Sequence, residues 1–133
     1  MAGGRTVNQI PAPDIARRVL IVEDEAMIAM LVELILQNAD CAVVGPVSSV
    51  RGALRLIERQ SLDAAVVDFR LGDDDSCEII DVLDQRGVPF LIMTGQEMAD
   101  LPPRLRHLNI MNKPFQPEAL VRAVEKILSA PVL

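Results

Sequence analysis

Short runs of apolar residues alternate along the chain with segments in which apolar residues recur at helical spacing. The apolar runs are rich in Val, Ile and Leu, which favours buried strands. The predicted strands cover residues 19–22, 42–45, 63–68 and 88–94, with a weaker one at 109–111. The predicted helices cover residues 26–37, 48–57, 75–86 and 116–128. The pattern therefore alternates strand and helix over most of its length.

The predicted strands are apolar at successive positions rather than at every second one, as in Val19-Leu20-Ile21-Val22. Strands of this kind are buried on both faces, which requires a parallel sheet with helices on each side. Five strand–helix units in 133 residues indicate an α/β fold with a doubly wound, five-stranded parallel sheet. The fourth helix is the weakest element, because residues 97–108 contain Pro102 and Pro103 and any helix there should be short or broken.

Composition narrows the class of protein. The net charge of −6 and the scattered Lys and Arg residues argue against a nucleic-acid surface, and no apolar run approaches the ~20 residues of a membrane span. Residues 1–16 are predicted to be a disordered N-terminal arm, with Ile10 and Ile15 as candidates for contact with a domain at 17–133. Cys41 and Cys77 are not spaced as a metal or redox pair, which indicates free thiols and a cytoplasmic protein.

Polar side chains stand at the carboxyl ends of the predicted strands. In chain order they are Glu23, Asp24, Glu25, Asp68, Thr94 and Lys113. Because these strand ends meet at one edge of a parallel sheet, we expect the side chains to converge. Carboxylates that lie close together repel and need a cation or a proton to coexist, and Mg²⁺ prefers such oxygen ligands. A screened carboxylate can accept a phosphoryl group, whose oxygens a lysine and a hydroxyl can stabilise.

Each residue also has an ordinary structural explanation. Asp24 could cap the first helix, and Glu25 could be a carboxylate of its first turn. Thr94 could be an ordinary strand residue and Lys113 a solvated one. The acidic run at 73–75 is expected to cap the third helix or to face water. The occurrence of the residues together, each at a strand end, favours the functional interpretation.

The motifs together resemble the receiver domain of two-component response regulators. They are Val-Glu-Asp-Glu at 22–25, Asp68 after the third strand, Thr94 after the fourth, and Lys113-Pro114-Phe115. The resemblance covers residues ~18 to ~130. It implies a flavodoxin-like (βα)5 order of the sheet and a cis Lys113–Pro114 bond.

The resemblance also implies a role for each residue. Asp68 would be the phospho-acceptor, and Thr94 and Lys113 would close on the phosphoryl group. The Mg²⁺ ligands would be Asp68, Asp24 directly, Glu23 as a second acidic partner, and the backbone carbonyl of Arg70. The expected partners are a sensor histidine kinase or a histidine phosphotransfer protein, and a downstream target protein; a homodimer is left open.

Four features depart from the usual receiver pattern. Ile110 stands where the switch aromatic is expected, and Leu71-Gly72 follows the acceptor where many receivers have a Pro-Gly pair. Gly95 follows Thr94 where Ala is commoner, and prolines interrupt the fourth helix. Atypical receivers that share the Thr-Gly pair and lack the aromatic are similar. The departures bear on how the signal is transmitted more than on phosphorylation.

The sequence is thus interpreted as a single-domain response regulator, with Mg²⁺-dependent transfer of a phosphoryl group to Asp68. No output domain is expected after Leu133, so the output would pass through a protein partner or a relay, with only self-phosphorylation and slow autodephosphorylation as catalysis. One alternative is a pseudo-receiver that binds partners without phosphorylation. Another is a haloacid-dehalogenase-like phosphatase, which would need a second Asp where Arg70 stands.

Three further features are left with two explanations each. Arg70 and Gln96 either flank the phosphoryl group and tune its hydrolysis or are exposed polar residues. His107 is expected to be a surface residue rather than part of a relay. The first helix is apolar nearly all round, so Met27, Met30 and Leu34 should reach its outer face. That face would be covered by the arm or the last helix, or would bind a helical partner such as a kinase's helical domain.

Overall fold

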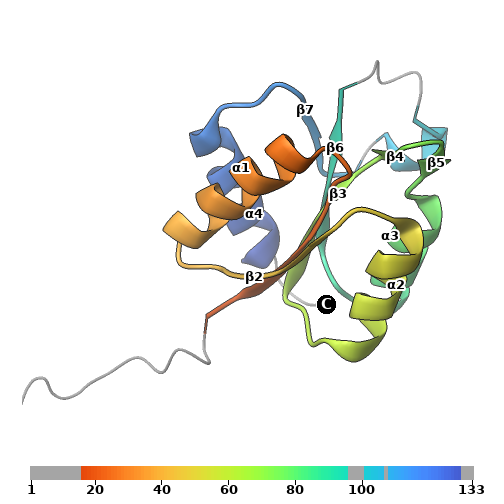
Figure 1. Ribbon diagram of the computed structural model, residues 1–133, viewed down its shortest axis with the longest axis horizontal. Coiled ribbons are helices and arrows are strands. Elements are labelled where there is room, and N and C mark those ends of the chain that lie inside the picture. The colour runs from red at the N-terminus through yellow and green to blue at the C-terminus, as the bar shows by residue number, and fades with distance from the viewer. Residues whose placement is uncertain (1–15, 96–100, 107, 130–133) are drawn as a thin grey trace, which may run out of the picture.

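The computed structural model describes residues 16–95, 101–106 and 108–129. Five parallel strands form one sheet in the order β2-β1-β3-β6-β7. The strands are β1 (Arg18–Val22), β2 (Ala42–Val47), β3 (Ala64–Asp68), β6 (Phe90–Thr94) and β7 (Ile110–Asn112). The central strand is β3, with β1 and β6 on its two sides (Figure 1). The predicted flavodoxin-like, doubly wound α/β fold is confirmed.

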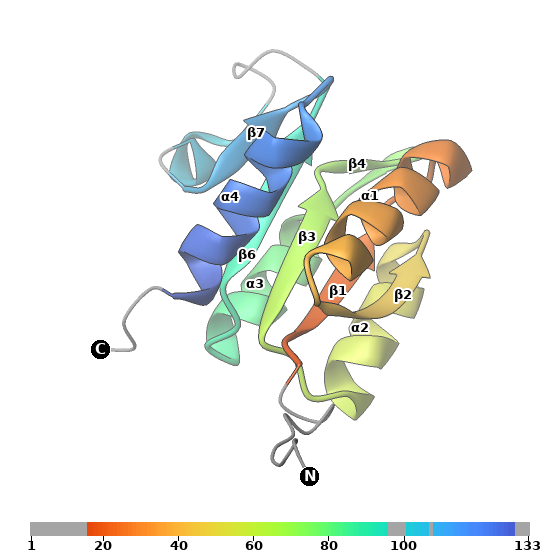
Figure 2. The ribbon, with the colours of Figure 1, turned by 90° about the vertical axis from the view of Figure 1, so that its left-hand side faces the viewer.

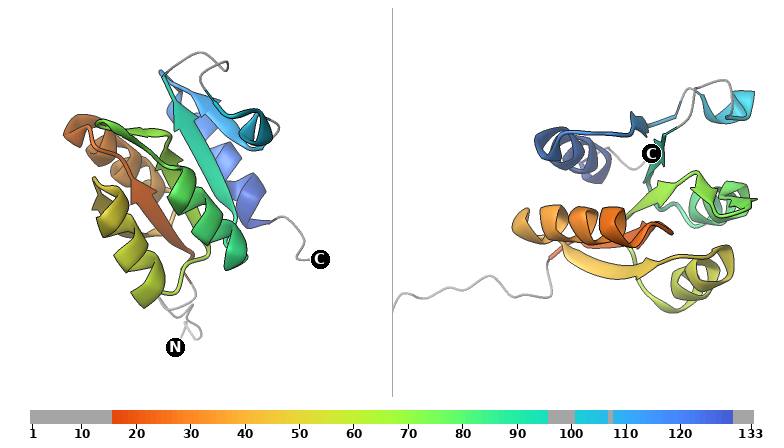
Figure 3. Two further views of the ribbon diagram at one scale, coloured as in Figure 1. Left: turned by 90° about the vertical axis from the view of Figure 1, so that its right-hand side faces the viewer. Right: turned by 45° about the horizontal axis from the view of Figure 1, so that its top comes forward.

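Helices cover both faces of the sheet. The helices α1 (Ala26–Asn38) and α4 (Pro117–Leu128) lie on one face, and α2 (Val50–Arg59) and α3 (Cys77–Gln85) lie on the other, as Figures 1 and 3 show. Successive residues of β1 contribute to different cores, since Val19 packs with α1 and α4 whereas Leu20 packs with α2 and α3. This two-sided burial explains why the strands are continuously apolar.

Local signals set the helix ends. The Ser49 hydroxyl caps α2 by accepting a hydrogen bond from the Gly52 amide over 3.0 Å, which selects Ser49 over Ser48 as the cap. Gly87 ends α3 with φ of +70°, a conformation that a residue without Cβ adopts at little cost. Pro117 occupies the first turn of α4, where its missing amide hydrogen is not needed.

Two segments differ from a regular strand–helix alternation. Between β6 and β7, the described residues 101–106 contain one short 3₁₀ helix, η4 (Pro103–Leu105), which agrees with the predicted short or broken fourth helix. After β3 the chain forms an antiparallel hairpin of β4 (Arg70–Leu71) and β5 (Asp74–Asp75), which the sequence pattern did not predict. The arm at 1–16 lies outside the described residues except for Ala16. None of the described helices has the length and apolar character needed to cross a membrane.

Candidate functional site

The carboxyl ends of β1, β3, β6 and β7 meet at one edge of the sheet, where the loops after them enclose a cavity of about 250 Å³. Strand register brings these ends level, because Asp68 pairs with Met93 in the next strand and Thr94 pairs with Asn112. The residues that line the cavity are Asp24, Glu25, Asp68, Arg70, Gly72, Thr94, Gly95 and Lys113. Side chains up to 90 positions apart in sequence therefore share one site.

Three carboxylates lie together in this site. Glu23, Asp24 and Asp68 each have a carboxylate oxygen within 4.8 Å of the others, and they are the one such acidic group found in the part of the chain that the structure describes. Glu23 and Asp68 are buried, whereas Asp24 is exposed at the mouth. Three negative charges this close need a positive partner.

Lys113 supplies a positive charge inside the cluster. Its Nζ lies 2.7 Å from Oε1 of Glu23, 3.1 Å from Oδ2 of Asp68 and 4.0 Å from Oε1 of Glu25. Burial disfavours the ammonium, but its contacts with Glu23 and Asp68 outweigh burial, so the pKa of Lys113 is raised and the charge persists at neutral pH. The Lys113–Pro114 bond is cis, as the resemblance implied.

Glu23 is the most constrained acid of the cluster. Its Oε2 accepts a hydrogen bond from the Glu25 amide over 3.1 Å, while its Oε1 faces Lys113. Burial raises the pKa of Glu23 and the negative charge of Asp68 adds to the rise, although the hydrogen bonds from Lys113 and Glu25 oppose it. A cation beside Glu23 would relieve this penalty.

The β4–β5 hairpin supports the cluster from the side of β3. The Gly72 amide donates a hydrogen bond to Oδ2 of Asp24 over 2.9 Å, and the Ser76 hydroxyl donates to the carbonyl oxygen of Asp68. The sequence alone indicated no role in the site for Gly72 or Ser76. Gly72 followed by Asp73 is a sequence pattern typical of a tight turn, and it could have suggested the hairpin. In the structure Gly72 adopts φ of +62°, which glycine tolerates at little cost. The bond to Asp24 depends on tertiary structure.

The remaining predicted residues lie as follows. Thr94 is buried at the end of β6, and Arg70 is exposed on β4 at the cavity wall. Ile110 is half-buried in β7, at the position where the family's switch aromatic is expected. Gln96 and His107 lie outside the described residues, so their predicted roles stay predictions.

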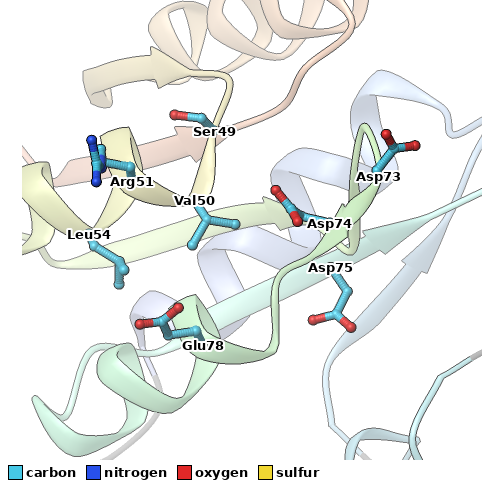
Figure 4. A pocket seen from close by; sticks show the side chains of 8 residues that line it. All are labelled: Ser49, Val50, Arg51, Leu54, Asp73, Asp74, Asp75 and Glu78. Atoms are coloured by element: carbon cyan, nitrogen blue, oxygen red, sulfur yellow. The ribbon is translucent and has the colours of Figure 1, made fainter.

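A second, larger cavity of about 760 Å³ lies between the start of α2 and the β5–α3 segment (Figure 4). Acidic residues 73–75 and Glu78 line it together with Arg51. Oδ1 of Asp75 accepts a hydrogen bond from the Cys77 amide over 3.0 Å at the start of α3, and the residues of the run are exposed. The arrangement agrees with the expectation that this run caps the helix and faces water.

The fold and the acid–lysine cluster at the sheet edge define the class of a signalling receiver domain. The sequence model of the response regulator receiver domain matches residues 19–125, and the chain belongs to this family. Receiver domains of this family take part in two-component signalling. In general they interact with histidine kinases and downstream targets, and they bind Mg²⁺ at an acidic pocket.

Similar proteins give the same assignment. The transcriptional regulatory protein PdtaR of Mycobacterium tuberculosis is 29% identical over 119 residues, which cover 86% of this chain and 58% of that protein. The regulatory protein VanR of Enterococcus faecium is 30% identical over 114 residues, which cover 81% of this chain and 48% of VanR. The chain thus spans about half the length of the curated relatives it matches.

Solved structures of receiver proteins superpose well on this chain. The solution structure of SdrG from Sphingomonas melonis Fr1 has a TM-score of 0.76 and 35% identity, and the match covers 85% of this chain and 97% of SdrG. The response regulator PhyR from Brucella abortus has a TM-score of 0.72 and 25% identity, with coverage of 86% of this chain and 48% of PhyR. Membership of this family favours a receiver over the dehalogenase-like phosphatase.

Proposed function

We propose that Asp68 accepts a phosphoryl group from a phosphohistidine of a partner kinase or phosphotransfer protein, in a reaction that requires Mg²⁺. The observation that carries the proposal is the position of the Asp68 carboxylate. It lies 3.1 Å from the Lys113 ammonium, beside two further carboxylates, at an open cavity. An ordinary buried ion pair needs neither the additional acids nor a cavity of this size.

The donor set fits Mg²⁺. An octahedral ion with oxygens at about 2.1 Å holds neighbouring ligands about 3.0 Å apart and opposite ligands about 4.2 Å apart. The oxygens of Glu23, Asp24 and Asp68 lie within 4.8 Å of one another, so the side chains would move closer together on binding, and carboxylate oxygens are the donors that Mg²⁺ prefers. Arg70 lines the same cavity, and its backbone carbonyl is the candidate for a further ligand.

The side chains divide the work of phosphoryl transfer. A bond forms between a carboxylate oxygen of Asp68 and phosphorus while the bond from phosphorus to the histidine nitrogen of the donor breaks. Lys113 holds Asp68 in place and offers its ammonium to a phosphoryl oxygen, and Thr94 offers a hydroxyl to another. Bound Mg²⁺ supplies positive charge that screens the repulsion between carboxylate and phosphate.

The wider role follows from this chemistry. We propose that residues 17–133 form the receiver domain and that phosphorylation shifts its conformational population toward a form that binds a downstream protein. A cytoplasmic location is part of the proposal, because Cys41 and Cys77 are free thiols, which are typical of a reducing compartment. Ile110 cannot act as an aromatic switch, so the signal must pass through other residues near β7 and α4.

Phosphorylation in vitro tests the proposal. Incubation with acetyl phosphate and Mg²⁺ should add the mass of one phosphate, which hydroxylamine removes. Asp68→Asn should abolish the gain, and Asp63→Asn, which changes an acid away from the cavity, should retain it. No gain in the unmodified protein would favour the pseudo-receiver, and repeated turnover of phosphate esters would favour a phosphatase.

A further inference from the structure

Ser76 stands between the β4–β5 hairpin and α3 and is fully buried. It occupies the N-cap position of α3, where a serine oxygen commonly accepts a hydrogen bond from an amide of the first helical turn. The Ser76 side chain makes no such bond. Its hydroxyl instead donates a hydrogen bond to the backbone carbonyl oxygen of Asp68, eight positions earlier in the chain.

Another residue caps the start of α3. Oδ1 of Asp75 accepts a hydrogen bond from the Cys77 amide over 3.0 Å, and the helix dipole favours a carboxylate at this end of a helix. Glu78 adds a second acidic side chain in the first turn. The Ser76 hydroxyl is therefore not required to begin α3, and its burial against Asp68 needs a different explanation.

The peptide group between Asp68 and Phe69 is held at both of its polar atoms. Its carbonyl oxygen accepts the hydrogen bond from Ser76, and its amide donates to the carbonyl oxygen of Met93 in β6 over 2.8 Å. Because a peptide group is planar, two such bonds fix the torsion ψ of Asp68. That torsion relates the peptide group to the Cα–Cβ bond, so Ser76 helps to set the direction of the Asp68 side chain.

Ser76 also closes the loop that carries the hairpin. Its amide donates to the carbonyl oxygen of Phe69 over 2.9 Å, which ties the end of the loop to its beginning. Gly72, within this loop, holds Asp24 through its amide. Figure 2 shows β4 beyond the end of β3, at the edge of the sheet where the site lies. The same serine therefore braces Asp68 and, through the hairpin, one acid of the proposed metal site.

We propose that Ser76 is a positioning residue for the transfer of the phosphoryl group to Asp68, an inference that rests on the proposed function. By holding the carbonyl oxygen of Asp68, it keeps the carboxylate 3.1 Å from the Lys113 ammonium at the cavity. Reacting groups tolerate little displacement, because an error of about 1 Å can cost about 10²-fold in rate. The alternative is a serine that only stabilises the junction of hairpin and helix.

The rate of phosphorylation tests the proposal. With saturating acetyl phosphate and Mg²⁺, Ser76→Ala should gain the mass of one phosphate about tenfold more slowly than the unmodified protein, because the Asp68 carbonyl loses a buried partner and its peptide group is less constrained. Ser76→Thr keeps the hydroxyl and should keep most of the rate. Urea unfolding of each variant ensures that rates are compared between folded proteins.

Asp75→Ala is the matched control. It removes the cap of α3 at the neighbouring position and leaves the hydrogen bond to Asp68 in place, so it should lower the free energy of unfolding and keep the rate within about twofold. Phosphorylation of Ser76→Ala at the unmodified rate would overturn the proposal. Equal slowing in Ser76→Ala and Asp75→Ala would also overturn it, because the stability of the junction would then account for the rate.

A second measurement needs no phosphorylation. In the metal-free protein, the ¹³C resonance of the Asp68 carboxyl group, identified by its loss in Asp68→Asn, reports the contact with Lys113. It should shift in Ser76→Ala and stay in place in Asp75→Ala, and a resonance that Ser76→Ala leaves unmoved would count against the proposal. No phosphate on the unmodified protein would refute the proposed function and this role with it. Equal rates with and without the Ser76 hydroxyl would refute this role and leave the proposed function standing.

Discussion

The amide of Gly72 donates a hydrogen bond to Oδ2 of Asp24 over 2.9 Å, across 48 positions of sequence. This bond joins the hairpin after β3 to the exposed acid of the cluster, and it fixes one carboxylate oxygen so that the other can face the cavity. Gly72 adopts φ of +62°, and a side chain there would meet no atom within 4 Å. The position therefore limits substitutions through backbone conformation rather than through space.

Gly72→Val should weaken Mg²⁺ binding several-fold, because a β-branched residue resists positive φ by about 1–2 kcal/mol and would shift the amide that holds Asp24. Gly72→Asn should stay near the unmodified protein, since Asn tolerates this conformation. Isothermal titration with Mg²⁺ measures the affinity. Gly87→Val is a matched control, because Gly87 has φ of +70° and an equally open surrounding at the end of α3. Equal losses of affinity in both valine variants would contradict the assigned role.

Lys113→Gln should destabilise the metal-free protein by up to about 3 kcal/mol at neutral pH, because it leaves Glu23 and Asp68 buried without their positive partner. Saturating Mg²⁺ should restore part of the loss. Urea unfolding with and without Mg²⁺ measures both effects. Lys126→Gln, at an exposed position in the last turn of α4, should change the free energy of unfolding little. A loss that Mg²⁺ leaves unchanged would speak against a shared site.

Mg²⁺ should raise the melting temperature more at about pH 8 than at about pH 5. Because the folded-state pKa of Glu23 is raised, the folded protein binds more protons than the unfolded chain just above the unfolded value of about 4.5. Stability without metal therefore falls as pH rises from there through the folded pKa. Mg²⁺ should therefore stabilise the protein most at pH values where the carboxyl group of Glu23 is ionised.

Thermal unfolding at both pH values measures this effect, and an equal rise in melting temperature at each pH would refute the coupling. Asp68→Asn should reduce the increment at the higher pH.

Arg70→Ala should shorten the lifetime of the acyl phosphate about two- to fivefold, the size of an exposed charge contact. Arg70 is exposed at the wall of the cavity, where its guanidinium can cover phosphoryl oxygens and hinder water. Loss of the added phosphate mass after removal of the donor gives the lifetime. Arg59→Ala, at the end of α2, is the control. Identical lifetimes for the two variants and the unmodified protein would end the idea.

The sequence predicted most of the fold because its strands are short, continuous and buried on both faces. The strand Val19-Leu20-Ile21-Val22 is apolar on both of its faces, so helices must cover both faces of the sheet to keep it from water. This requirement predicts a doubly wound sheet. The hairpin at 70–75 was not predicted. Its strands have two residues each, with Leu71 as the one apolar residue, which is too short for a hydrophobic pattern, and their pairing depends on a turn at Gly72.

For the site, the sequence by itself determined which residue types end each strand, and parallel strands bring such ends to one edge. Only the tertiary structure decided how they pair. It placed Lys113 closer to Glu23, at 2.7 Å, than to Asp68, at 3.1 Å, and it buried Glu23 while leaving Asp24 at the mouth. The sequence could not determine these distances or the difference in burial. They depend on how the loops after four strands pack together, and no residue spacing within one segment encodes that packing.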